Sequence, residues 1–174
     1  MSLEIGVGKL DHLPYLTEML KDSNVRNLHL KGRQCLSPIL IQPKSMPRLR
    51  VLSLSGVAMN QMSLNHLSEW ILDPHSIVEG LHITNLLRDY SIDWSEFLHN
   101  VLATKRTLKN LTLSSALLPI DLFVEDYPFA CQMLLHPETQ IEEISLVPPY
   151  SPLQHCLSHL FTYLPRVKTL KKLS

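Results

Sequence analysis

Aliphatic residues recur along the chain in one short pattern, in which the first, fourth and sixth positions are aliphatic. Five segments fit the pattern in full, and a sixth fits its first two aliphatic positions. The six segments are VRNLHL from Val25, LRVLSL from Leu49, VEGLHI from Val78, LKNLTL from Leu108, IEEISL from Ile141 and VKTLKK from Val167. Their starts lie 24, 29, 30, 33 and 26 residues apart. Self-similarity at a period of roughly 20–50 residues is typical of repeat proteins, so the chain is predicted to be an array of repeats.

The repeat that starts at Leu49 shows how one unit is built. Leu52 and Leu54 flank a polar residue, which is the two-residue alternation of a half-buried strand. Ser55 and Gly56 then supply turn chemistry that ends the strand. Apolar residues at helical spacing predict a helix next, and Pro74 ends it because the residue before proline avoids the α region. The apolar residues of this helix are Leu64, Leu67, Trp70 and Ile71.

The other repeats are predicted to follow the same order of strand, turn and helix. Further helices are expected at residues 13–20, 97–102 and 153–164. The stretch 39–47 should hold little helix, and the proline-containing stretch 119–139 should be a loop followed by a short helix near 129–135. Ile5 and Val7 are predicted to be the remnant of a preceding strand, one step before Leu28 and Leu30. The residues expected to stack inward in two columns are Leu28, Leu30, Leu52, Leu54, Leu81, Ile83, Leu111, Leu113, Ile144 and Leu146.

Strand, turn and helix at this period resemble the leucine-rich repeat. The long period and the helices resemble its ribonuclease-inhibitor-like and F-box-associated subclasses, and the phrase LRVLSLSGV is similar to repeats of the PRAME family. The resemblance covers roughly residues 10–173. It implies an α/β solenoid of about six repeats, with a curved parallel sheet on the concave side and helices on the convex side. We therefore expect residues 1–174 to be a single array, and a segment of a longer protein.

The chain departs from that family at the ninth position of each repeat, where the family has an asparagine that bonds to the backbone of the turn. The ninth positions here are Arg33, Val57, Leu86, Ala116 and Pro149. The backbone groups that an asparagine would satisfy must therefore find other partners or water. The turns are expected to be irregular and the curvature uneven.

The second, third and fifth positions of each strand should point into the concavity. These positions carry charges of both signs, which suits recognition of a charged protein surface or peptide, although a solvated polar face without a partner is the alternative at any one position. The candidate partner-binding residues are Arg26, His29, Arg50, Glu79, His82, Lys109, Glu142, Glu143 and Lys168. No aromatic residue stands on this face, so the alternative anchors are the loop residues Tyr90, Trp94, Tyr127, Phe129 and Tyr150.

The resemblance implies a non-catalytic protein-protein interaction module, either the substrate-recognition part of a ubiquitin ligase receptor or a scaffold. Any adaptor-binding box of such a receptor would have to lie outside this stretch. One alternative is a regulatory protein of the GTPase-activating type, for which Arg33 and Arg88 are weak candidates. Another is the ligand-sensing array of an innate immune receptor.

Overall charge gives no reason to expect nucleic acid or a membrane as partner. Sixteen basic residues balance sixteen acidic ones, and no apolar run is long enough to span a bilayer. Three cysteines, far apart and not in CxxC form, favour a reducing compartment, so a cytoplasmic or nuclear location is expected. The charged fraction of 18% is below the usual quarter, which suggests that some apolar surface is covered by a partner or a further repeat.

Candidate chemistry is sparse. His155 and His159 have a spacing that can place two metal ligands on one helix face, but no third ligand is evident, and a surface pair is the favoured interpretation. His29 and His82 occupy equivalent strand positions and could make binding pH-sensitive, with coincidence as the alternative. The chain contains neither a GxSxG elbow nor a GxxxxGK[ST] loop. No catalytic residue, cofactor, metal or small-molecule substrate is predicted.

Overall fold

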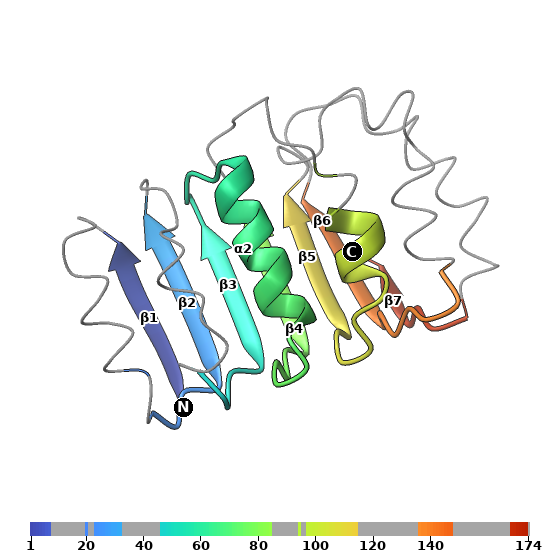
Figure 1. The fold of residues 1–174 in the computed structure, drawn as a ribbon, viewed down its shortest axis with the longest axis horizontal. Coiled ribbons are helices and arrows are strands. Elements are labelled where there is room, and N and C mark those ends of the chain that lie inside the picture. The colour runs from blue at the N-terminus through green and yellow to red at the C-terminus, as the bar shows by residue number, and fades with distance from the viewer. Residues whose placement is uncertain are drawn as a thin grey trace.

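The computed structural model describes residues 1–7, 20, 23–32, 46–84, 94, 97–114, 136–147 and 168–173. Within them a seven-stranded parallel sheet has its strands in sequence order (Figure 1). The strands are β1 (Ser2–Val7), β2 (Asn27–Gly32), β3 (Val51–Ser55), β4 (Gly80–Thr84), β5 (Asn110–Ser114), β6 (Glu143–Val147) and β7 (Lys172–Leu173). The helical elements are α2 (Gln61–Leu72) and the π-helical η4 (Phe97–Leu102). The prediction of an α/β chain with a parallel sheet is confirmed.

One backbone contact repeats across the whole sheet, just before each strand. The N–H of the second residue of a repeat donates to the carbonyl of the equivalent residue in the repeat before it. The distances are 2.7 Å from Arg50 to Arg26, 2.7 Å from Glu79 to Arg50, 2.8 Å from Lys109 to Glu79, 2.8 Å from Glu142 to Lys109 and 2.6 Å from Lys171 to Glu142. Each of these carbonyls also accepts a second hydrogen bond, from the N–H of the residue after the donor; the carbonyl of Arg26, for example, accepts from both Arg50 and Val51. The register is therefore set at the point where each strand begins.

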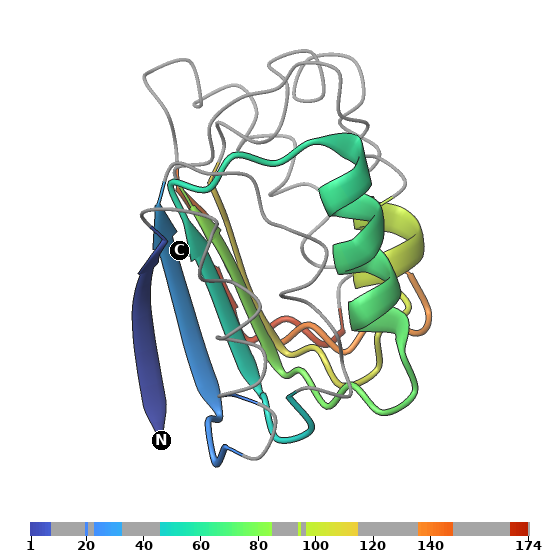
Figure 2. The same cartoon turned by 60° about the vertical axis from the view of Figure 1, so that its left-hand side comes forward.

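Two columns of aliphatic side chains form the core on one face of the sheet. The residues at the fourth and sixth positions, from Leu28 to Ile144, are at most 3% exposed. Figure 2 shows α2 and η4 on this face, and the buried apolar residues of both helices belong to the same core cluster. Burial of each such side chain contributes about 1.5–3 kcal/mol. The predicted inward columns are confirmed, apart from Leu146, whose side chain lies outside the described part of the chain.

Helix α2 begins and ends where its flanking residues dictate. The side-chain Oδ1 of Asn60 accepts a hydrogen bond from the N–H of Ser63 at 2.8 Å and so caps the first turn. Asp73 leaves the helical conformation, with ψ at 132°, directly before Pro74. The stripe of apolar residues predicted for this helix is buried, as expected.

The turn after β3 needs glycine. Gly56 has a φ of 68°, in the left-handed region that side chains disfavour, and its N–H donates to the carbonyl of Thr84 at 3.0 Å. Val57, at the ninth position where the family has asparagine, is buried instead. In this repeat the turn is therefore stabilised by a backbone contact to the next strand and by an apolar side chain.

The register of the last repeat differs from the prediction. Leu173 lies opposite Ile144, and Leu170 packs against the core as the first residue of the repeat. The prediction had placed Val167 first and Leu170 fourth, which is wrong by three residues. VKTL and LKKL have the same spacing of aliphatic residues, and both overlap at Leu170, so the aliphatic pattern alone does not distinguish them.

The first strand is present, as predicted, but its register is two residues away from the expected one. Leu3 pairs with Leu28 and Ile5 with Leu30, whereas the prediction had paired Ile5 and Val7 with these residues. A shift of two keeps the same side chains on the same face, so the alternating pattern does not exclude either register. The strand consequently reaches back to Ser2.

A buried lysine joins two neighbouring repeats. Lys105 is only 9% exposed, and its Nζ donates to the carbonyl of Ser76 at 2.8 Å and to that of Asp73 at 3.3 Å. The pKa of Lys105 is lowered overall, because burial disfavours its charge more than the nearby charge of Asp73 favours it. Nearby, the hydroxyl of Thr107 donates to the carbonyl of Val78 at 2.7 Å. The segment before β5 is thus hydrogen-bonded to the segment before β4.

Several predictions fall on residues that the structure does not describe. The helix at 153–164 lies entirely outside the described residues, and only Leu20 of the helix at 13–20 lies within them. Of the stretch 119–139, only 136–139 is described, and it forms a turn in which the N–H of Thr139 donates to the carbonyl of His136 at 3.0 Å.

The core columns can be tested with Leu52→Asp. This change puts a carboxylate among buried aliphatic side chains, which removes packing worth about 2–5 kcal/mol and adds an unpaired charge. Because a domain of this size has about 5–15 kcal/mol of stability, we expect no cooperative thermal transition in circular dichroism. Ser53→Asp, one residue along on the opposite face, should melt within a few degrees of the parent. A Leu52→Asp variant that melts like the parent would show the register to be wrong.

The role of Lys105 can be tested with Lys105→Ala. The change removes a charged donor and leaves two carbonyls with one partner fewer, so the free energy of unfolding should fall by about 1.5–3 kcal/mol. Urea denaturation measures it, and Lys109→Ala is the control because Lys109 is exposed. Equal stability of the two variants would mean that the buried contacts contribute nothing.

Candidate functional site

The face of the sheet opposite α2 and η4 is the candidate site, and we call it the open face. No described helix or strand covers it, as Figure 2 shows from the side. Its side chains come from the third and fifth positions of each repeat, and register places equivalent residues in rows across the sheet. The third-position row is Ser2, Asn27, Val51, Gly80, Asn110, Glu143 and Lys172, and the fifth-position row is Glu4, His29, Ser53, His82, Thr112 and Ser145.

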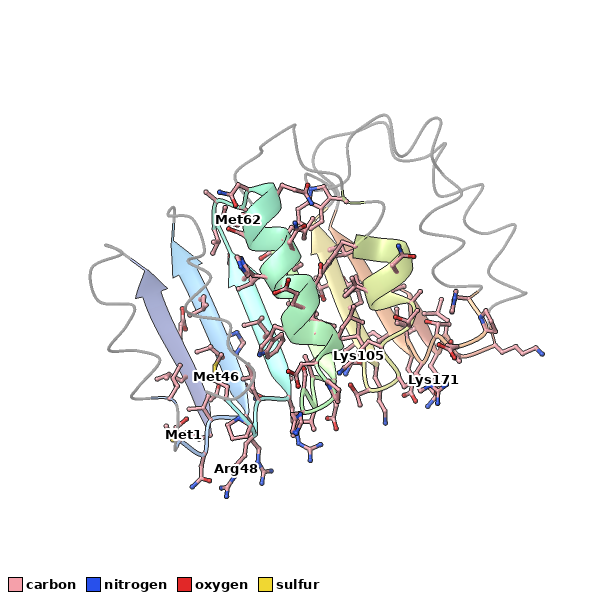
Figure 3. All side chains as sticks on the ribbon, in the orientation of Figure 1. Met1, Met46, Arg48, Met62, Lys105 and Lys171 are labelled. Carbon is pink, nitrogen blue, oxygen red and sulfur yellow. The ribbon has the colours of Figure 1, made fainter. Side chains whose placement is uncertain are left out.

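A row of charged residues precedes the strands along one edge of this face. The row consists of Arg26, Arg50, Glu79, Lys109, Glu142 and Lys171. Arg50 forms an ion pair with Glu79, and Lys171 Nζ lies 2.9 Å from Glu142 Oε2. Figure 3 shows Lys171 at the edge where the strands begin. Four of the six charges are therefore joined in pairs between adjacent repeats.

The ionisation of Glu142 reflects this row. The hydrogen bond from Lys171 is the largest cause of a lowered pKa, burial acts against it, and the charges of Lys171 and Lys109 lower the pKa further. Glu142 is therefore held as a carboxylate, and the charges alternate in sign from Arg50 to Lys171.

Lys168 does not belong to this row, contrary to the prediction. It is exposed in the bend before β7, and Lys171 takes the second position of the last repeat. The error follows from the three-residue register shift described above. The other eight predicted residues lie on the open face or along its charged edge.

His82 is half-buried in the middle of the open face. Its Nδ1 lies 2.8 Å from the hydroxyl of Thr112 on the next strand. It also packs over Gly80, where an added Cβ would lie 3.3 Å from a methyl of Val51 and 3.6 Å from His82 Nε2. Burial lowers the pKa of His82, and the charge of His29 in the same row lowers it further.

Beside His82 lies a hollow of about 210 Å3, which we call the polar hollow. It spans β4 to β7, and its lining is His82, Asn110, Leu111, Thr112, Glu143, Ile144, Ser145 and Lys172. Glu143 and Lys172 are register partners on adjacent strands and are both exposed. The prediction missed Lys172, which it had assigned to an inward position. The segment LKKL starts 29 residues after Ile141, a normal repeat length for this chain, and this spacing is the signal that would have placed Lys172 on the open face.

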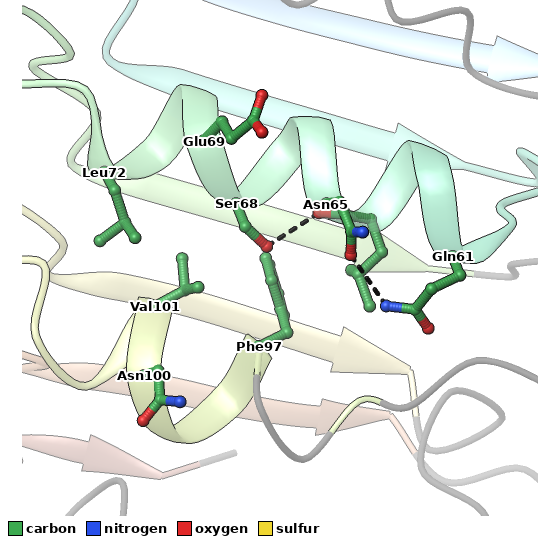
Figure 4. A pocket seen from close by; sticks show the side chains of 9 residues that line it. Gln61, Asn65, Ser68, Glu69, Leu72, Phe97, Asn100 and Val101 are labelled. Carbon is green, nitrogen blue, oxygen red and sulfur yellow. Dashed lines mark hydrogen bonds between the residues drawn. The ribbon is translucent and has the colours of Figure 1, made fainter.

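A second cavity, of about 260 Å3, lies between α2 and η4 on the opposite side of the molecule (Figure 4). Three of its polar side chains form hydrogen bonds within α2. Ser68 Oγ donates to the carbonyl of Leu64 at 2.8 Å, and Gln61 Nε2 donates to Asn65 Oδ1 at 2.9 Å. These contacts occupy polar groups that a ligand would use, so the open face is the stronger candidate.

Trp94 was predicted as an alternative loop anchor, and this is wrong. It is 5% exposed and packs edge-to-face against Phe97, with ring centroids 5.8 Å apart. The other alternative anchors, Tyr90, Tyr127, Phe129 and Tyr150, lie outside the described residues, as do Arg33, Arg88, His155 and His159.

No protein-family model and no curated protein matches the chain. In the described ranges, no group of three or more His, Cys, Asp or Glu side chains could hold a metal ion. None of the described helices has the length and apolar character needed to cross a bilayer.

The burial of His82 predicts a pH-dependent stability. Unfolded His82 takes up a proton near its ordinary pKa of 6.5, whereas the folded protein resists protonation until the pH is lower. The free energy of unfolding should therefore fall as the pH drops through 6.5 and stop falling below the folded pKa. His82→Gln should remove this part of the slope.

Urea denaturation from about pH 7.5 down to about pH 5 measures the effect, because linkage makes the slope of the unfolding free energy against pH proportional to the difference in protons bound by the unfolded and folded states. His75→Gln is the matched control, since the His75 side chain is 80% exposed. If His82→Gln and His75→Gln change the slope equally, burial of His82 is not its cause.

Proposed function

We propose that the chain is a non-catalytic protein-recognition module that binds its partner on the open face. The observation that carries the proposal is the difference in side-chain chemistry between the two faces of the sheet. One face holds the aliphatic columns, and the other presents polar and charged side chains in ordered rows. A rigid, regularly spaced polar surface has no role in the core and suits recognition of another macromolecule.

Within this proposal the array is a leucine-rich-repeat solenoid, and the open face is its concave side. The spacing of equivalent strand residues supports the assignment. Leu28, Leu52, Leu81, Leu111 and Ile144 pair in order, and successive members are 24, 29, 30 and 33 residues apart. Solenoids whose strands line one side use that side as an extended binding surface.

The charges of the face favour a protein partner over nucleic acid. Duplex DNA would require several free cations, but Arg50 and Lys171 are engaged by carboxylates. Mixed charges in fixed positions instead discriminate between protein surfaces. Substrate recognition for a ubiquitin ligase and scaffolding both need only such a surface, and we propose this kind of role for the chain.

A pair of matched double variants tests the face. Ser53→Arg with Thr84→Arg places two long side chains on the open face, and Met62→Arg with Asn65→Arg adds the same charge on exposed positions of α2. Affinity capture from cell extract, quantified by mass spectrometry, should lose its specific partners about tenfold or more with the first variant only, which corresponds to about 1.4 kcal/mol.

Both variants should melt like the parent, which separates lost binding from lost folding. Equal capture by the two variants would contradict the proposal. Loss with the α2 variant alone would place the partner on the helical side.

A further inference from the structure

The polar hollow is lined by two opposite charges, those of Glu143 and Lys172. Glu143 and Lys172 are exposed and are register partners, yet no hydrogen bond or ion pair joins either side chain to another described residue. The neighbouring charged row behaves differently, because Arg50 is paired with Glu79 and Lys171 with Glu142. The hollow thus offers one carboxylate and one ammonium group to an incoming partner.

Apart from Leu111 and Ile144, the remaining wall of the hollow is polar and uncharged. Asn110 and Ser145 supply an amide and a hydroxyl, and the contact between His82 and Thr112 holds the far side of the wall in place. Such groups can both donate to and accept from a peptide main chain. The wall therefore adds hydrogen bonds without changing the balance of charge.

The size of the hollow indicates what enters it. Its 210 Å3 is below the roughly 300–1,000 Å3 of pockets that enclose drug-sized ligands. It has room for side chains that reach in from a larger molecule lying on the open face.

Resting on the proposed function, we propose that the polar hollow receives an extended segment of a partner protein with one acidic and one basic side chain two residues apart. The acidic side chain pairs with Lys172 and the basic one with Glu143. Alternate side chains of an extended chain point to the same side at intervals of about 6.5–7 Å, whereas adjacent strands lie about 4.8 Å apart. The exposed, flexible side chains of Glu143 and Lys172 bridge this difference.

Repulsion makes the hollow selective. A segment with two acidic residues brings a carboxylate against Glu143, and a segment with two basic residues brings a cation against Lys172, so each is penalised. Overall attraction does not compensate, because the sixteen basic and sixteen acidic residues of the chain give no net charge. Local pairing inside the hollow therefore decides which segment binds.

Selection from a random peptide library displayed on phage tests this proposal. The immobilised proteins are the parent, Glu143→Lys and Lys172→Glu. The parent should enrich peptides with one acidic and one basic residue two positions apart. Glu143→Lys should enrich peptides with two acidic residues at that spacing, and Lys172→Glu should enrich peptides with two basic residues.

Two exposed residues outside the hollow provide matched controls. Glu69→Lys on α2 makes the same charge change as Glu143→Lys, and Lys168→Glu makes the same change as Lys172→Glu. Both should enrich the peptides that the parent selects. Identical motifs from the parent and both hollow variants would overturn the proposal, and so would motifs in the parent that carry a single sign of charge.

A further selection separates this inference from the proposed function. If Ser53→Arg with Thr84→Arg abolishes enrichment while the hollow variants select the same motif as the parent, the open face binds but the hollow does not choose the partner. If no protein enriches any peptide above the bare support, the hollow proposal is overturned, and the capture experiment alone then decides the proposed function.

Discussion

Parallel pairing of consecutive strands constrains the rest of this molecule. Each strand takes its register from a pair of backbone N–H groups that donate to the carbonyl of one residue in the preceding repeat. Once that contact forms, alternate side chains must point to opposite faces. The aliphatic ones then meet α2 and η4, and the polar ones are left on the face that no described element covers. Core and candidate site thus follow from the same backbone contact.

The sequence predicts the middle of the sheet well because several signals agree there. In the repeat from Leu49, the alternation of Leu52 and Leu54, the glycine turn and the stripe on α2 all indicate one arrangement, and all are present. The register of the strands at the two ends of the sheet is harder to predict. The segments VKTL and LKKL overlap at Leu170, and only pairing with β6 decides which of them is the repeat. For β1, two registers that differ by two residues place the same side chains on the same face, so the pairing with β2 again decides the register.

Contacts between repeats could not be predicted, because the partners are about 30 residues apart and no local pattern joins them. The carbonyls that Lys105 meets become neighbours only when two strands are laid side by side. The prediction for Trp94 failed for another reason: its sequence surroundings indicate a loop, but its ring is buried in the core, packed against Phe97 only three residues away. At the candidate site, the charged residues of each strand could be predicted individually. Their pairing, and the hollow around Glu143 and Lys172, depend on which strands are adjacent.

The burial of Lys105 also gives this fold a built-in reporter. Amine-directed reagents modify lysines whose Nζ they can reach, and this Nζ is enclosed by the carbonyls of Asp73 and Ser76. Its labelling should therefore proceed only through openings that separate the two repeats, at a rate set by how often they part. Lys109, four residues away and exposed, would label at its ordinary rate in the same sample. The ratio of the two rates measures local breathing at this junction without any label being introduced by mutation.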